Sequence, residues 1–143
     1  MVIPVGDDGR ILMVRQYRYL SDSICVEFPC GGVLAGLSPE QNALKELREE
    51  TGFTSRELIP IGWFTPFTGA SDERCSVFIA RQLELSPLEP DETEEIELVL
   101  TTFDDIENMV QTNELNDGLS LAAWSLSKLK LLEIVKGAVS LVK

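Results

Sequence analysis

Residues 31–53 read GGVLAGLSPEQNALKELREETGF, a glycine-rich loop that runs into a strongly marked helix. Ser38 is a natural N-cap, Pro39 suits the first helical position, and Gln41 completes a capping box with Ser38. The glycine that closes the acidic run is the expected helix terminator. This stretch therefore predicts a helix over residues 38–51, entered from a loop flexible enough to bring its backbone close to a ligand.

Three glutamates lie near the end of this predicted helix. Because a helix advances by about 100° per residue, Glu46 and Glu50 project together, with Glu49 one step aside. Carboxylates are hard oxygen ligands that suit Mg²⁺ or Mn²⁺, ions that also bind phosphate oxygens. A solvated acidic face is the alternative, since Lys45 and Glu49 form an ordinary i,i+4 pair.

The chain has 143 residues, a common size for one domain, and we expect residues 1–143 to form a single domain. Its 12 basic and 24 acidic side chains give a net charge of 12 − 24 = −12. Such a surface repels a phosphate backbone, so long nucleic acids and anionic membranes are not expected partners. A small anionic substrate stays compatible, provided that metal ions or local arginines and lysines offset the repulsion.

The cysteines Cys25, Cys30 and Cys75 are an odd number in a sequence without a hydrophobic N-terminal leader. This pattern argues against a secreted disulfide scaffold and predicts a cytoplasmic location. The sequence contains no histidine, so acid–base chemistry falls to carboxylates, lysine, tyrosine or cysteine.

The rest of the sequence alternates strand-like and helix-like segments. This order predicts an α/β fold in which helices lie on both faces of a mixed sheet. Residues 1–5 and 10–17 flank an Asp-Gly turn and are expected to pair as a hairpin. Further strands are expected at residues 24–28, 57–65, 74–85 and 96–102, with a helix at 103–111.

The last long apolar stretch covers residues 119–142. Lysines and a glutamate interrupt it before it reaches the roughly 20 apolar residues of a membrane span. It is therefore expected to be an amphipathic helix that packs on the core. Its expected buried stripe is Leu126, Leu129, Ile134 and Val135.

The segment from Gly31 to Phe53 resembles the Nudix box, G-x5-E-x7-R-E-U-x-E-E-x-G-U, in which U is a bulky aliphatic or aromatic residue. Two positions depart from the box, since Leu37 stands at its first glutamate and Lys45 at its arginine. In the family, the glutamate and the arginine at these two positions look like a supporting pair that orients the metal-binding carboxylates. The positions that agree are Gly31, Glu46, Leu47, Glu49, Glu50, Gly52 and Phe53.

The resemblance extends to residues 14–19, 27–31 and 69–73, which look like segments of ADP-ribose pyrophosphatase-like members. It implies a Nudix-type α/β/α sandwich with a mixed sheet, and a pyrophosphohydrolase that depends on Mg²⁺ or Mn²⁺. The implied substrate is a small nucleoside diphosphate derivative, ADP-ribose or another ADP-sugar. One position departs here too, because Thr68 stands where members that cleave ADP-ribose usually have proline.

The resemblance also implies roles for the acidic residues. Glu46 and Glu50 would bind the metal, Glu49 would share or support it, and the carbonyl of Cys30 would add an oxygen. A base that deprotonates or orients the attacking water is expected in the acidic loop at residues 90–97. The expected base is Glu92, with Glu94 as base or further metal ligand; a merely solvated loop is the alternative.

Four other side chains are candidates for binding the substrate. Arginine can bind two phosphate oxygens at once, so Arg15, Arg18 and Arg74 are expected to hold the diphosphate, with surface ion pairs as the alternative. Trp63 is expected to stack on the nucleobase, with core packing as the alternative.

Two other functions are compatible with the same residues. A Nudix hydrolase could act instead on nucleoside triphosphates, dinucleoside polyphosphates or GDP-sugars. Alternatively, the departures at Leu37 and Lys45 suit a catalytically weak domain that senses a nucleotide-sugar. A homodimer is also open, but it would need a surface other than the N-terminal region through which many related enzymes pair.

Overall fold

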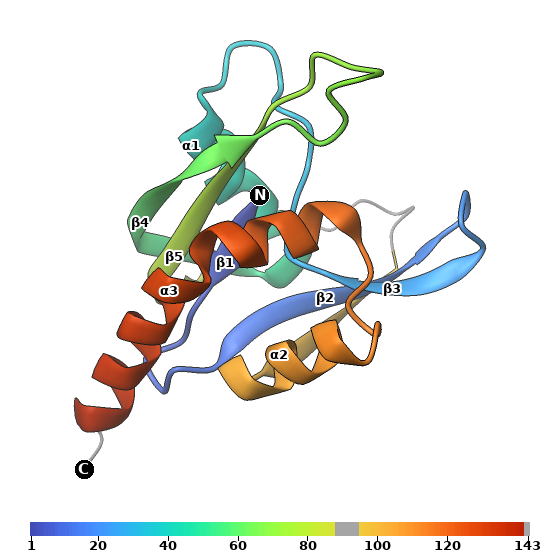
Figure 1. Ribbon diagram of the computed structural model, residues 1–143. Coiled ribbons are helices and arrows are strands. Elements are labelled where there is room, and N and C mark those ends of the chain that lie inside the picture. The colour runs from blue at the N-terminus through green and yellow to red at the C-terminus, as the bar shows by residue number, and fades with distance from the viewer. Residues whose placement is uncertain (88–94, 142–143) are drawn as a thin grey trace.

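A computed structural model of the chain describes residues 1–87 and 95–141. These residues form strands and helices in an alternating order, as the sequence predicts (Figure 1). The predicted element boundaries agree with the observed ones to within a few residues. The elements are β1 (Val2–Pro4), β2 (Ile11–Arg18), β3 (Ser23–Glu27), α1 (Pro39–Thr51), β4 (Phe53–Phe64), β5 (Cys75–Leu85), β6 (Ile96–Thr101), α2 (Phe103–Gln111) and α3 (Gly118–Leu141).

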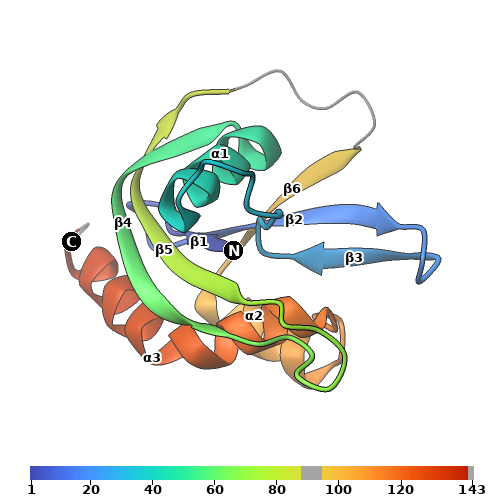
Figure 2. The same cartoon turned by 90° about the horizontal axis from the view of Figure 1, so that it is seen from above.

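The strands form two three-stranded sheets, ordered β1-β5-β4 and β3-β2-β6. The first sheet is mixed, because β5 pairs in parallel with β1 and antiparallel with β4. The long β4–β5 ribbon curves around α1, while α2 and α3 lie on its other side (Figure 2). Helices thus cover both faces, which confirms the predicted α/β/α arrangement with a mixed sheet.

The predicted hairpin between the first two strands is wrong. The turn itself forms, with the amide of Gly6 donating to the carbonyl of Arg10 at 2.8 Å. However, β1 pairs in parallel with β5, and it shares with β2 the isolated bridge between Val5 and Ile11. The reason is burial: Val2 and its neighbours are covered on both sides, and such uniformly apolar strands suit parallel pairing inside the molecule.

Helix α1 begins and ends as predicted. The hydroxyl of Ser38 accepts from the amide of Gln41, and the Gln41 side chain accepts from the amide of Ser38, which completes the capping box. Gly52 closes the helix with a φ of 76°, a left-handed conformation that favours glycine. Ala43 and Leu47 are buried in a small apolar cluster against β1 and β5. The opposite side of the helix is thereby left to its polar residues.

Helix α3 packs through a different stripe from the predicted one. Leu126 and Leu129 are 45% and 76% exposed, so that part of the prediction is wrong, whereas Ile134 is buried. The buried side is set by Trp124, whose ring lies 4.8 Å from that of Phe103 and 6.4 Å from that of Phe28, measured between centroids. The other buried residues of this side are Ser120, Ala123, Ser127, Leu131 and Ala138.

Among the described residues, no helix combines the length and apolarity that crossing a membrane requires. Helix α3 is long, but polar side chains are spread along it. Two of these, Ser120 and Ser127, are fully buried and hydrogen-bonded, the first to the amide of Phe28 and the second to the carbonyl of Ala123. The helix is therefore integrated into the core of the domain.

Candidate active site

Glu46 of α1 lies directly against the backbone of Gly31. A methyl group added at Gly31 would sit 2.3 Å from the carboxyl carbon of Glu46, far inside van der Waals contact. Only a residue without a Cβ therefore lets this carboxylate rest on the loop in its present position. The Glu46 side chain is 13% exposed, so it is a largely buried charge that needs polar partners.

Those partners come from the same helix. The amide nitrogen of Asn42 donates to Glu46 Oε1 at 3.3 Å, and Lys45 Nζ lies 3.4 Å from the same oxygen. Lys45 also forms an ion pair with Glu49, and this hydrogen bond is the main reason why the pKa of Lys45 is raised. The residue at the arginine position of the box thus bridges two of the three glutamates.

Glu50 meets the same loop one residue earlier. The backbone amide of Cys30 donates to Glu50 Oε2 at 3.3 Å. Glu46 and Glu50 therefore contact consecutive residues of the loop, Gly31 and Cys30. This arrangement follows from their i,i+4 spacing, which places both side chains over one stretch of backbone.

In this arrangement Lys45 engages Glu46 and Glu49, while Glu50 accepts from the amide of Cys30. Within residues 1–87 and 95–141, no three acidic or cysteine side chains stand close enough together to hold a metal ion as they are. The donor set nevertheless fits a hard divalent cation, since Glu46, Glu49 and Glu50 offer only oxygen and the loop backbone beside them adds carbonyls. The glycine that makes room for Glu46 supports the same conclusion.

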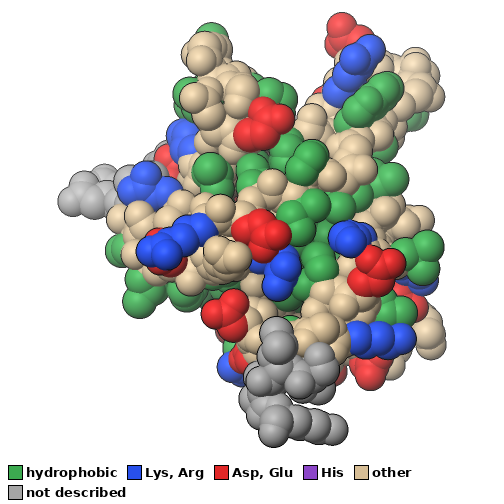
Figure 3. Space-filling view, turned by 90° about the vertical axis from the view of Figure 1, so that its left-hand side faces the viewer, with side chains coloured by type: hydrophobic (Ala, Val, Ile, Leu, Met, Phe, Trp, Pro, Cys, Tyr) green, Lys and Arg blue, Asp and Glu red, His purple; other side chains and the backbone are tan. Residues whose placement is uncertain are grey.

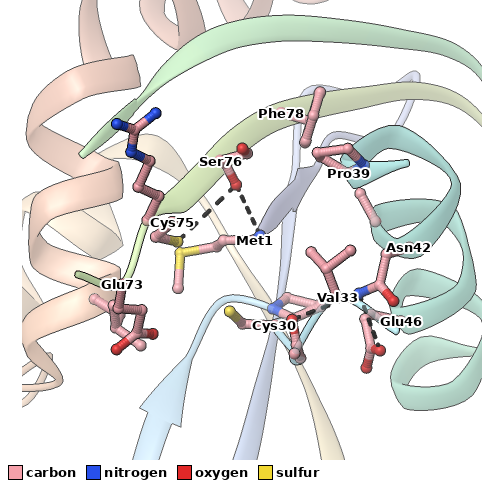
Figure 4. A pocket seen from close by; sticks show the side chains of 16 residues that line it. Met1, Cys30, Val33, Pro39, Asn42, Glu46, Glu73, Cys75, Ser76 and Phe78 are labelled. Carbon is pink, nitrogen blue, oxygen red and sulfur yellow. Dashed lines mark hydrogen bonds between the residues drawn. The ribbon is translucent and has the colours of Figure 1, made fainter. Parts of the chain in front are cut away.

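A cavity of about 360 Å³ opens beside Glu46 (Figure 4). It lies between the loop after β3, the beginning of α1 and the beginning of β5. Asn42 and Glu46 approach it from α1, while Cys30 and Cys75 approach it from the loop and from β5. Its charged lining side chains are Glu46, Glu73 and Arg74.

The two thiols of this cavity interact with each other. A hydrogen bond with Cys75 raises the pKa of Cys30, and burial raises it further. The same hydrogen bond lowers the pKa of Cys75 to about 7. Because a thiol with a raised pKa is a poor ligand for a hard cation, the group that Cys30 can offer to Mg²⁺ is its backbone carbonyl.

The three candidate arginines have different surroundings. Arg15 pairs with Glu97 at 3.1 Å. Arg18 donates to both carboxylate oxygens of the buried Glu27, at 2.9 and 2.5 Å, and these hydrogen bonds raise the pKa of Arg18. Arg74 alone among them lines the cavity, and in the described part of the chain no carboxylate lies within ion-pair distance of it. The structure thus places Arg74 in the lining of the same cavity as Glu46, and engages Arg15 and Arg18 in other ion pairs.

Trp63 is not a core residue, since it is 57% exposed at the end of β4. The guanidinium of Arg74 lies over its ring, 4.7 Å from the centroid, in a cation–π contact. Its neighbour Phe64, in contrast, packs against the main core. Trp63 therefore keeps an aromatic surface at the protein exterior and touches one lining residue of the cavity.

Two predicted site residues, Glu92 and Glu94, lie outside the described residues. On the face drawn in Figure 3, acidic and basic side chains alternate rather than gather by sign.

The sequence interpretation missed Asn42, which is 2% exposed and donates a hydrogen bond to Glu46. A signal was present, because Asn42 precedes Glu46 by four residues and therefore lies on the same face of the helix.

Comparison with known proteins decides the family. The family model of the NUDIX domain matches residues 1–122, which is most of the chain. The chain belongs to the Nudix family. This confirms the family resemblance seen in residues 31–53.

Individual relatives agree with that assignment. An ADP-ribose pyrophosphatase of Bacillus subtilis (strain 168) is 36% identical over 137 residues, which cover 94% of this Nudix chain and 73% of the relative. A methanol dehydrogenase activator of Bacillus methanolicus is 29% identical over 124 residues, 85% of this chain and 67% of the relative. A crystal structure of an ADP compounds hydrolase has the same fold, with a TM-score of 0.81, 22% identity, and coverage of 92% of this chain and 72% of that one.

Proposed function

We propose that this Nudix protein hydrolyses the diphosphate linkage of a nucleoside diphosphate derivative, with ADP-ribose or another ADP-sugar as the substrate class. The observation that carries the proposal is the Glu46 carboxylate held on Gly31 at the edge of a cavity. A relative that matches 94% of the chain is an ADP-ribose pyrophosphatase, which supports the choice of substrate.

Glu46 and Glu50 would hold the divalent metal, with Glu49 and the carbonyl of Cys30 as further oxygen ligands. Nudix hydrolases generally depend on divalent metals, and the all-oxygen donor set favours Mg²⁺, with Mn²⁺ as a substitute. Such an ion, when bound, polarises the diphosphate and lowers the pKa of a coordinated water. The protein's own part is to fix the carboxylates, and both contact the loop at residues 30 and 31.

Arg74 is the arginine best placed to attract the diphosphate. It lines the cavity together with Glu46 and Glu73, and an anion that enters needs a cation to offset those two carboxylates. Trp63, which lies under the Arg74 guanidinium, offers the aromatic surface for a nucleobase. Glu92, with Glu94 as the alternative, stays our candidate for the base, on the strength of the family resemblance.

A panel of substrates tests the proposal directly. ADP-ribose, other ADP-sugars, a GDP-sugar, a dinucleoside polyphosphate and a nucleoside triphosphate would be incubated with the protein and Mg²⁺ or Mn²⁺, and the products identified. We expect AMP and a sugar phosphate from ADP-sugars, and a loss of at least about a hundredfold in kcat for Glu50→Gln, since a metal ligand is removed. Hydrolysis that Glu50→Gln leaves unchanged would contradict the metal assignment.

The same panel distinguishes the enzyme from a nucleotide-sugar sensor. A sensor would leave every compound intact, while one of them would raise the melting temperature by binding the folded state. The Lys45 ion pairs with Glu46 and Glu49 are the feature that favours this second function, because a lysine there competes with a metal ion. Cleavage of any compound with loss of activity in Glu50→Gln would exclude it.

A further inference from the structure

Asn42 is a buried amide near the beginning of α1, four residues after the N-cap Ser38, and its place there is not explained by the stability of the helix. It is 2% exposed, although asparagine is a weaker helix former than alanine and burial of its polar group is costly. The neighbouring buried residues, Ala43 and Leu47, are apolar and pack on the sheet. The amide must therefore be retained for the groups that it contacts.

Those groups belong to the candidate metal site. Asn42 Nδ2 donates to Glu46 Oε1 at 3.3 Å and lies 3.5 Å from the carbonyl of Gly31, at the long limit of a hydrogen bond (Figure 4). Asn42 Oδ1 accepts from the amide of Leu34 at 3.2 Å. One side chain thus connects the helix, the loop at residues 31–34 and the Glu46 carboxylate.

Only one orientation of this amide satisfies its surroundings. The nitrogen of Asn42 faces two acceptors, the Glu46 carboxylate and the Gly31 carbonyl, and its oxygen faces the N–H of Leu34. Turning the amide over would set an oxygen against two oxygens and a nitrogen against an N–H. Its contacts therefore fix Glu46 relative to the loop in a single arrangement.

Lys45 also contacts Glu46, but its ion pair with Glu46 differs from the hydrogen bond that Asn42 donates. Its side chain is 30% exposed and is shared with Glu49. A divalent cation that binds Glu46 would repel the Lys45 ammonium, whereas a neutral amide can keep its hydrogen bond. The hydrogen bond from Asn42 to Glu46 can therefore persist both before and after a metal ion binds.

From these contacts we infer that Asn42 is a positioning residue, which holds the Glu46 carboxylate and the 31–34 loop in the arrangement that accepts the metal. The inference rests on the proposed function, because it takes Glu46 as a metal ligand. It also gives a reason why this chain tolerates Leu37 and Lys45 at the positions of the family's supporting pair. Asn42 supplies from the helix an orienting hydrogen bond to the same carboxylate.

Binding of Mn²⁺ to the metal-free protein, followed by electron paramagnetic resonance of the free ion, tests this role without any substrate. We expect Asn42→Ala, and the similarly shaped Asn42→Leu, to weaken Mn²⁺ binding on the order of 10–100-fold, as for other groups that orient a metal ligand. Asn108→Ala, at an exposed position of α2, is the matched control and should leave binding unchanged.

A double-mutant cycle separates positioning from general destabilisation. If Asn42 acts through Glu46, its substitution should weaken Mn²⁺ binding much less in a Glu46→Gln background than in the wild type. Melting temperatures of the same samples measure stability separately. The inference alone would be overturned if Asn42→Ala and Asn42→Leu bound Mn²⁺ as tightly as the wild type, or if the losses were equal in both backgrounds. If the wild-type protein bound no Mn²⁺, the inference would be overturned together with the proposed metal site.

Discussion

At the scale of single residues, the candidate site depends on the absence of one atom. Gly31 has no Cβ, and this absence lets the Glu46 carboxylate lie on the loop backbone. The φ angle of Gly31 is not in the left-handed region, so its glycine is required by space rather than by backbone conformation. The adjacent Gly32 differs, because a Cβ there would meet nothing within 4 Å.

This contrast gives a prediction with an internal control. Gly31→Ala should displace the flexible Glu46 carboxylate, and we expect kcat/KM in Mg²⁺ to fall on the order of 100-fold, because small misplacements of catalytic groups are costly. The melting temperature should change little, since the tip of a side chain can move aside. Gly32→Ala should retain wild-type activity, and equal activity of the two variants would show that the contact between Gly31 and Glu46 is dispensable.

At the scale of elements, α1 sets the positions of all three glutamates. Its capping box fixes where the helix begins, and Gly52 fixes where it ends. Lys45, on the same helix, forms ion pairs with Glu46 and Glu49. Leu37, which precedes the helix, offers no carboxylate to that side of the site.

We therefore predict that restoring the family's pair strengthens the site. The double variant Leu37→Glu with Lys45→Arg should raise kcat/KM at limiting Mg²⁺ by roughly tenfold, the lower range for groups that orient metal ligands. Arginine can bind a carboxylate through two parallel hydrogen bonds, which lysine cannot. Steady-state rates at several Mg²⁺ concentrations would check this, with each single variant as control; a double variant no faster than Lys45→Arg alone would contradict it.

At the scale of the whole molecule, α3 joins the β4–β5 ribbon to α2. Trp124 stacks on Phe28 and packs against Phe103 with tilted rings, and its indole nitrogen donates to Glu107 of α2 at 2.5 Å. Leu131 lies about two helical turns after Trp124 and is fully buried in the main core. The stability of the domain therefore depends on the face of α3 that carries these two residues.

Two leucines of α3 allow this to be measured. Leu131→Ala should lower the free energy of unfolding by about 2–5 kcal/mol, because it leaves a cavity in the core. Leu129→Ala makes the same chemical change at a position that is 76% exposed, and it should cost less than about 0.5 kcal/mol. Urea denaturation of both variants checks the difference, and similar losses in the two would mean that another face of α3 is the buried one.

The sequence by itself determined the elements and the identity of the acidic residues. The capping box of Ser38 and Gln41, the terminating Gly52 and the spacing of Glu46 and Glu50 are local signals between residues a few positions apart. Local hydrogen bonds and helix geometry act on such signals in any surroundings. For this reason the bounds of α1 and the family could be predicted without a structure.

Only the tertiary structure decided how distant segments pair and which faces they bury. The turn after β1 allows a hairpin, yet β1 pairs with β5, and the apolar stripe of α3 allowed Leu129, yet Trp124 turned the helix toward Phe28 and Phe103. The partners of Asn42 were hidden for the same reason. Long-range contacts are chosen by the packing of the whole core, and a sequence pattern shows that a side is apolar or polar without showing what it will meet.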